Sequence, residues 1–218
     1  MNSKRILIWV SFVVVIGLIV WGLIAAEIKS SRKESNGLPP DKILETDHIR
    51  GDFNAPVTLL EYGDFQCPAC AIYYPIIERL IADVGSSTLR FVFRHFPLGL
   101  HANSMPAAYA GESAEERGKF WEMYGLLYER QTAWESSSDP KSIFVGYAKE
   151  LGLNEEKFLA DFGTEKAKNR IDADRIGGTK AGVNSTPTFF INGKQIKDIR
   201  SYDEFKKIIN DAVPKISF

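Results

Sequence analysis

The sequence is poor in cysteine and histidine, and it has no excess of charge of either sign. Its 218 residues include two cysteines and three histidines, and 27 basic residues against 28 acidic ones give a net charge of -1. Two cysteines are too few for a multi-disulfide scaffold or a four-cysteine zinc site. The balanced charge argues against a nucleic-acid-binding protein, which would normally carry a basic stripe. The composition, 44% hydrophobic, is otherwise that of an ordinary globular domain.

One stretch near the N-terminus contains no charged residue at all. Residues 6–26 would form a helix roughly 31 Å long, which is enough to cross the hydrocarbon core of a membrane. Lys4 and Arg5 precede the stretch, and Trp9 and Trp21 lie near its two ends, where indole rings prefer the membrane interface. The pattern predicts a single transmembrane helix.

A cleaved signal peptide is the alternative for this segment. The apolar region of such a peptide is usually only about 7–15 residues, and Ile24 is too large for the small residue wanted before a cleavage at Ala26. We therefore predict that residues 1–26 are a cytoplasmic tip and a transmembrane signal anchor. Residues 27–47 form a polar linker, and residues 48–218 form one acidic domain.

The domain alternates strand and helix signals, which predicts an α/β fold. The predicted order is a strand at 57–62, a helix from Cys67 to 84, a strand at 88–94, a helical block at about 100–163, a helix at 165–181, a hairpin at 187–199 around Asn192-Gly193, and a helix at 202–213. The strand–helix–strand start implies a parallel pair, to which the later hairpin adds antiparallel strands.

The two cysteines, Cys67 and Cys70, lie where the first strand passes into a helix. If Cys67 caps that helix and Pro68 is its first residue, the helix dipole and the free backbone donors favour the Cys67 thiolate. A lowered pKa enlarges the population of the nucleophilic form. Cys70, one turn later, comes close enough to form a disulfide with Cys67, so the spacing predicts a redox pair.

Other interpretations of the cysteine pair are a structural disulfide and a metal site. A disulfide that closes only four residues contributes only about 2 kcal/mol, which is little for a domain of this size. A zinc site needs two more ligands, and the candidates His95 and His101 are six residues apart, outside the usual gap. His95 is better explained as a structural group at a strand end.

The run EYGDFQCPAC, from Glu61 to Cys70, resembles the DsbA-like thiol–disulfide oxidoreductases of the thioredoxin fold. A second motif, STPTFFING at residues 185–193, is similar to that family's cis-proline loop and the hairpin after it. The two motifs flank the helical block in the family's order. The resemblance covers about residues 48–213, and it implies a thioredoxin-like fold with an inserted helical domain at about 100–163.

The resemblance also implies roles for individual residues. Cys67 and Cys70 would be the catalytic redox pair, and Glu61 matches the buried acid beneath the second cysteine. Pro187 would follow a cis peptide bond, with Thr186 beside it to bind substrate. The two residues between the cysteines, Pro68 and Ala69, would also contact substrate. Ala69 departs from the strongly oxidising members, which often carry histidine there, and its side chain cannot stabilise the thiolate as an imidazolium would.

The expected function is therefore a membrane-anchored, extracytoplasmic thiol–disulfide oxidoreductase that donates disulfides. Its substrates would be thiols of secreted or envelope proteins. The resemblance implies a quinone-linked membrane oxidoreductase as recycling partner, and no metal or dissolved cofactor is needed. Alternatives are a disulfide reductase or isomerase with the same residues, a thiol-based metal carrier, and a peptide-binding module.

Overall fold

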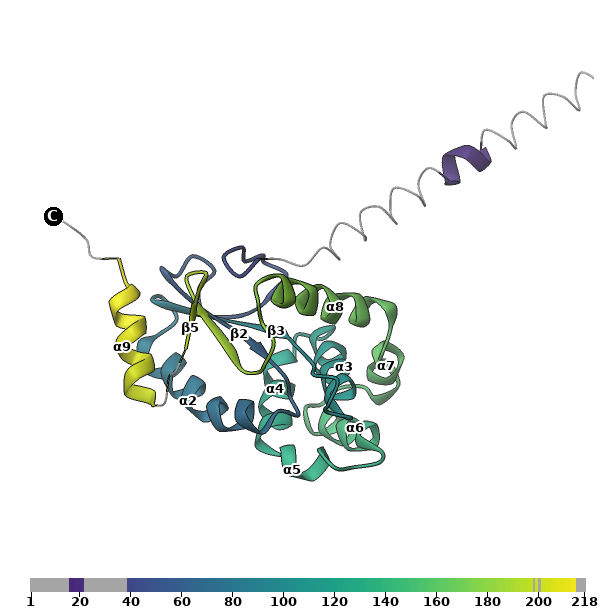
Figure 1. The fold of residues 1–218 in the computed structure, drawn as a ribbon. Helices are drawn as coiled ribbons and strands as arrows, with labels where there is room; N and C mark the ends of the chain where they lie inside the picture. Colours follow the sequence, from purple (N-terminus) through teal and green to yellow (C-terminus); the bar gives the residue numbers. More distant parts are fainter. Residues whose placement is uncertain (1–15, 22–38, 198, 200, 215–218) are drawn as a thin grey trace, which may run out of the picture. The chain divides into compact units, whose positions relative to one another are not determined.

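The computed structural model describes residues 16–21, 39–197, 199 and 201–214 (Figure 1). The chain divides into two units, Met1–Asn36 and Gly37–Phe218. In the first unit residues 16–21 are helical, and the rest of the predicted transmembrane segment lies outside the described residues. Within the described part of the chain, none of the helices has both the length and the apolar character needed to span a membrane.

A five-stranded mixed sheet forms the centre of the second unit (Figure 1). The strands are β1 (His48–Arg50), β2 (Val57–Gly63), β3 (Leu89–His95), β4 (Thr188–Ile191) and β5 (Lys194–Ile196), in the spatial order β1-β3-β2-β4-β5. β2 and β3 run parallel, and the other neighbours are antiparallel. The predicted parallel pair and the added hairpin are both confirmed. The three-residue edge strand β1 was not predicted.

The helices follow the predicted order. They are α2 (Pro68–Val84), α3 (Ser104–Glu115), α4 (Phe120–Glu129), α5 (Gln131–Trp134), α6 (Pro140–Glu150), α7 (Glu155–Asp161), α8 (Glu165–Lys180) and α9 (Tyr202–Ala212). α3 to α7 make up the helical block predicted between β3 and α8. Asp139 and Asn154 cap α6 and α7, and their side-chain oxygens accept from the backbone amides of Ser142 and Lys157.

The central strand β2 is buried along its whole length, and its side chains contribute to the hydrophobic cores on both faces of the sheet. Because side chains alternate along a strand, Leu59 joins the larger core with α2 and the helical block, whereas Leu60 and Tyr62 join the smaller core on the other face. Gly178 of α8 packs against this second face, where a Cβ would lie 2.8 Å from the Phe96 ring. The helix can approach the sheet this closely because residue 178 has no side chain.

Buried Arg94 on β3 holds the chain that leads into β1. Its guanidinium donates to the carboxylate of Asp47 at 3.0 and 3.2 Å, and to the backbone oxygens of Pro39 at 3.1 Å and Lys42 at 2.6 Å. A buried guanidinium is tolerated only when its donors are satisfied in this way. The end of the predicted linker is thereby fixed to the domain.

Candidate active site

The cysteine motif begins where β2 ends and α2 starts. The backbone of Cys67 is extended, with φ -69° and ψ 121°, and Pro68 occupies the first turn of α2. Cys67 is therefore the N-cap residue, as the sequence predicts, and Pro68 is favourable because the first helical position needs no N–H donor. Cys70 lies one turn further on. The two cysteines come within 3.7 Å of each other, and both are buried free thiols.

The second predicted motif meets the first. The Thr186–Pro187 peptide bond is cis, as predicted. The Cys67 thiol donates a hydrogen bond of 3.2 Å to the backbone oxygen of Thr186. The Thr188 hydroxyl donates to the backbone oxygen of Ser185 at 2.7 Å and so fixes the loop from its other side. The fold thus brings Cys67, Cys70, Thr186 and Pro187 into one site.

The environment of Cys67 favours its thiolate. A hydrogen bond from the Cys70 side chain lowers the pKa of the Cys67 thiol most, and further hydrogen bonds from Thr186 and from the backbone amides of Ala69 and Cys70 add to it. These effects exceed that of burial, which acts in the opposite direction, and the pKa falls to about 5. Ala69 therefore contributes through its backbone, at the free N–H end of the helix.

The pKa values of Cys70 and Glu61 are raised, in contrast to that of Cys67. Burial raises the pKa of Cys70 well above its ordinary value, and its hydrogen bond to Cys67 acts in the same direction. Burial also raises the pKa of Glu61 to about 8, with a smaller contribution from the charge of Cys67. Oε1 of Glu61 is buried and has no hydrogen-bond partner. A carboxyl group that is protonated near neutral pH is suited to exchange a proton with a buried thiolate.

Asp64 organises the turn before Cys67, a role that the sequence analysis missed. Its Oδ1 accepts from the Gln66 amide at 2.9 Å and the Ser104 hydroxyl at 2.6 Å. Its Oδ2 accepts from the Leu98 amide at 3.0 Å and pairs with His101 Nδ1 at 2.7 Å. The bond to Gln66 is a local Asx-type contact that the Asp-x-Gln spacing could have indicated. The other three contacts come from residues at least 34 positions away.

Gln131 is a second residue that the sequence analysis missed. Its side-chain amide is buried and donates to the backbone oxygens of Phe65 at 2.7 Å and Cys67 at 3.1 Å. Gln131 begins α5 in the helical block, so this contact ties the block to the cysteine turn. No local pattern around Gln131 signals the contact, because its partners are backbone atoms of a distant segment.

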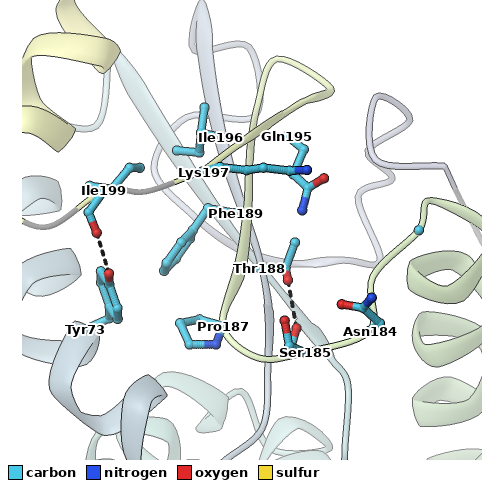
Figure 2. Close-up of a pocket in the computed structure, with 11 residues that line it drawn as sticks. Tyr73, Asn184, Ser185, Pro187, Thr188, Phe189, Gln195, Ile196, Lys197 and Ile199 are labelled. Carbon is cyan, nitrogen blue, oxygen red and sulfur yellow. Dashed lines mark hydrogen bonds between the residues drawn. The ribbon is translucent and has the colours of Figure 1, made fainter.

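A pocket of about 410 Å³ lies beside the cis-proline (Figure 2). Pro187, Thr188 and Phe189 form one wall, and Gln195 and the backbone of the hairpin strand form another. Tyr73 of α2 closes one end, where its hydroxyl donates to the backbone oxygen of Ile199 at 2.5 Å. The pocket therefore presents backbone, amide and aromatic groups to a ligand, and it lies next to the loop of Thr186 and Pro187.

Comparison with protein families gives one match that covers most of the chain, a model described as "Thioredoxin" over residues 44–211. Among solved structures, oxidised BdbD from Bacillus subtilis is 26% identical, with a TM-score of 0.70 over 81% of this chain and 96% of that chain. Alpha-DsbA1 from Wolbachia pipientis has a TM-score of 0.70 at 19% identity, over 78% of this chain and 92% of that chain, and this likeness shows the fold alone.

Curated relatives match by sequence over a part of their length. A protein named Na(+)/H(+) antiporter NhaA 1 from Salinispora arenicola is 38% identical over 152 residues, which are 69% of this chain and 22% of that protein. The NhaA-named protein of Herminiimonas arsenicoxydans is 38% identical over 166 residues, 76% of this chain and 25% of that protein. The chain thus spans about a quarter of the length of these relatives.

Proposed function

This chain belongs to the thioredoxin family, and from that premise we propose that its Cys67–Cys70 pair donates disulfides to protein thiols outside the cytoplasm. The solved structures it resembles are thiol–disulfide oxidoreductases of the DsbA type. The observation that carries the proposal is the contrast between the two thiols. The pKa of Cys67 is lowered to about 5, whereas that of Cys70 is raised. Stabilising the Cys67 thiolate stabilises the reduced pair, which makes its disulfide a better oxidant.

The reaction starts from the oxidised pair. A substrate thiolate attacks Cys67 Sγ, the bond to Cys70 Sγ breaks, and a mixed disulfide forms while Cys70 leaves as a thiolate. Glu61, protonated at neutral pH, is placed to supply the proton that Cys70 takes up. A second substrate thiolate then attacks the substrate sulfur of the mixed disulfide. Cys67 leaves as a stable thiolate, the substrate holds the disulfide, and the pair has gained two electrons.

Thr186, Pro187, Pro68 and Ala69 are proposed to contact the substrate chain during these steps. The loop before β4 offers backbone groups beside Cys67, and an extended peptide binds such groups as an added strand does. The pocket beside Pro187 would then hold a substrate side chain next to the reacting cysteine. Pro68 and Ala69 separate the two cysteines, so a substrate attached to Cys67 Sγ passes close to them.

The cell membrane is the proposed location, with residues 1–26 as a single-pass anchor and the domain in an oxidising compartment. Disulfide donation is useful only where thiols are not kept reduced. The reduced pair would pass the two electrons that it received from the substrate to a quinone-linked membrane oxidoreductase. Alkaline extraction of membranes checks the anchor: the full chain should stay in the membrane pellet, and a chain that starts at residue 27 should be released.

The reduction potential of the pair, measured against glutathione, tests the proposed direction. A disulfide donor should have a potential well above that of thioredoxin, toward the DsbA end of a range that runs from about -270 to about -120 mV. A value at the thioredoxin end would indicate a reductase. In parallel, Cys70→Ser should accumulate mixed disulfides on Cys67 in non-reducing gels, and Cys67→Ser serves as the control that forms none.

A further inference from the structure

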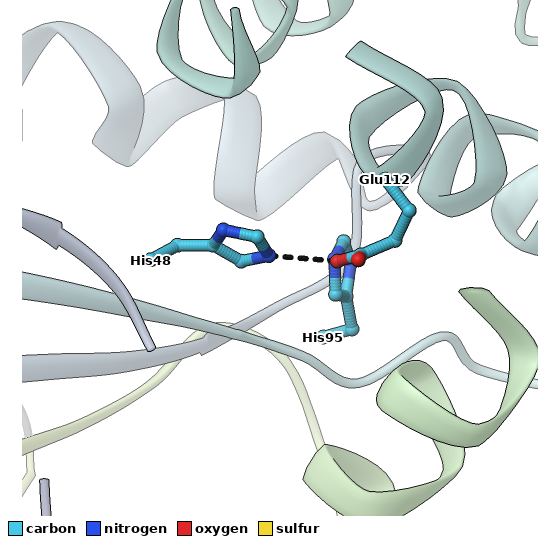
Figure 3. Close-up of side chains that lie close together, drawn as sticks. All are labelled: His48, His95 and Glu112. Carbon is cyan, nitrogen blue, oxygen red and sulfur yellow. Dashed lines mark hydrogen bonds and ion pairs between the residues drawn. The ribbon is translucent and has the colours of Figure 1, made fainter. Parts of the chain in front are cut away.

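Two histidines and a glutamate meet in the interior, apart from the cysteine pair (Figure 3). His48 comes from β1, His95 from the end of β3 and Glu112 from α3, and all three are buried. Oε1 of Glu112 lies 2.7 Å from Nε2 of His48 and 2.8 Å from Nε2 of His95. Three separate segments of the chain thus bring one possible ligand atom each to the same place, with both imidazole nitrogens next to one carboxylate oxygen.

We propose that His48, His95 and Glu112 bind a Zn²⁺ ion. Two imidazole nitrogens and one carboxylate oxygen are a donor set that zinc takes in proteins, with a water molecule as the fourth ligand. Softer metal ions such as Cu(I) would need thiolate ligands, and calcium or magnesium would need oxygen ligands in place of the imidazoles.

The distances fit an ion after small side-chain movements. The three ligand atoms lie within 4.8 Å of one another. In a tetrahedral zinc site with bonds of about 2.0–2.1 Å, ligand atoms are about 3.3 Å apart, so shifts of the order of 1 Å complete the geometry. Without metal, each Nε2 carries a proton that it donates to Oε1 of Glu112, because a carboxylate oxygen can only accept. On binding, that proton moves to Nδ1, and the Nε2 lone pair becomes the zinc ligand.

The groups around the triad suit the metal-bound tautomer. Nδ1 of His48 faces Oε2 of Glu115 at 3.8 Å. With the proton on Nε2, that arrangement sets a lone pair against a carboxylate, whereas a zinc-bound His48 carries its proton on Nδ1 and can donate it to Glu115. A carboxylate that receives the second N–H of a ligating histidine is the usual outer partner in zinc sites. The Glu115 side chain is about half-exposed, whereas that of His48 is buried.

The surroundings also restrict movement of the ligands. The His48 ring stacks on Phe120 with ring centres 3.5 Å apart, and the backbone amide of His95 donates to the buried carboxylate of Asp174 at 3.1 Å. An ion at this point would join the edge strand β1 to β3 and to the helical block. The proposed zinc would therefore connect these segments while it keeps a water molecule as its fourth ligand, and its binding is independent of the direction of disulfide exchange.

The test uses the full chain with Cys67 and Cys70 oxidised to the disulfide, so that the thiols cannot bind zinc, after removal of metals with a chelator. Calorimetric titration with Zn²⁺ should give one ion per chain, and the melting temperature should rise with zinc. X-ray absorption at the zinc edge should show nitrogen and oxygen ligands at about 2.0–2.1 Å, imidazole scattering and no sulfur. Failure of the oxidised chain to bind zinc overturns the proposal, and so does sulfur ligation.

Variants locate the ion. His48→Gln and Glu112→Gln should each abolish the single equivalent of zinc, and Glu115→Gln should weaken binding about 10-fold to 100-fold by removing the outer partner. His101→Gln is the matched control, because it changes the histidine outside the triad, and it should still bind one ion. Unchanged zinc affinity in the two ligand variants contradicts the site. If those variants do not fold, the absorption spectrum of the unaltered chain decides the question.

Discussion

The thiol of Cys67 donates a 3.2 Å hydrogen bond to the backbone oxygen of Thr186, although 119 positions separate the two residues. The contact joins the start of α2 to the loop before β4, the two places at which the sequence carries its motifs. Since the side chain of Thr186 contributes to the lowered pKa of Cys67, the loop helps to set the reactivity of the thiol.

The first prediction concerns the ionisation of Cys67. In the reduced protein the rate of alkylation by iodoacetamide should follow the thiolate, with a midpoint near pH 5, because the pKa is lowered to about that value. Cys70→Ala removes the side chain whose hydrogen bond makes the largest contribution, and we expect its midpoint to move to higher pH. A midpoint near 9 in the unaltered protein would show that the site does not stabilise the thiolate.

Replacement of Glu61 by Gln should slow disulfide exchange. Gln has nearly the same shape but cannot transfer a proton, and general acid–base catalysis typically contributes 10²–10⁴-fold, so we expect a loss of about 100-fold near neutral pH. Stopped-flow oxidation of a model dithiol peptide measures the rate. Unaltered circular dichroism would show that the fold is kept, and an unaltered rate would remove Glu61 from the mechanism.

The same residue should make stability depend on pH. Its pKa is about 8 in the folded protein and near 4.5 in the unfolded chain, so the folded state binds more protons between these values. The free energy of unfolding should therefore fall as pH rises through this window, by up to about 1.4 kcal/mol per pH unit. Urea titrations of the oxidised protein, in which no thiol ionises, should show this slope. Glu61→Gln should reduce it, and an equal slope in both proteins would contradict the assignment.

Asp64→Asn should destabilise the cysteine turn. The new amide can replace one carboxylate oxygen as acceptor but not both, so the part-buried backbone amide of Leu98 or of Gln66 loses its partner. The expected cost is about 1–3 kcal/mol, measured by thermal unfolding. Asp139→Asn is the control, since asparagine caps a helix as well as aspartate does and the site is exposed. Equal melting temperatures for the two variants would mean that Asp64 does not organise the turn.

Gly178→Ala tests the close contact between α8 and the sheet. A Cβ there would lie 2.8 Å from the Phe96 ring and 2.9 Å from that of Tyr62, so packing must shift, at a cost of about 1–3 kcal/mol. Gly146→Ala in α6 meets no atom within 4 Å and should instead be neutral or stabilise, since alanine favours helix. Chemical unfolding distinguishes the two, and a stabilised Gly178→Ala would refute the contact.

Local signals were sufficient where the structure depends on local contacts. The hairpin turn follows from Asn192-Gly193, and both residues have positive φ, 47° and 80°. The start of α2 follows from Cys67 and Pro68, whose positions satisfy the rules for a helix N-terminus. The membrane anchor and the identity of substrates stay predictions, because they fall outside the described residues or concern other molecules.

Contacts between distant segments were beyond prediction from the sequence. β1 is only three residues long, too short to show a period of alternating side chains, and it is defined by its pairing with β3. The meeting of His48 and Glu112 depends on packing of β1 against α3 across 64 positions. In the sequence, His95 and His101 could be considered only as zinc ligands for the cysteines, with an unsuitable gap of six residues, whereas the fold places His95 against Glu112 and His101 against Asp64.

The buried contacts of Arg94 have a mechanical consequence. Any pull on the chain from its N-terminal side enters the domain at residues 39–47, where four hydrogen bonds from one guanidinium carry part of the load. Arg94 lies within β3, which pairs with β2, and Arg170 of α8 also donates to the backbone oxygen of Thr46 and to the Asp47 carboxylate, so the load divides between the sheet and α8. The attachment of the N-terminal segment is therefore shared by two guanidinium groups from separate elements of the domain.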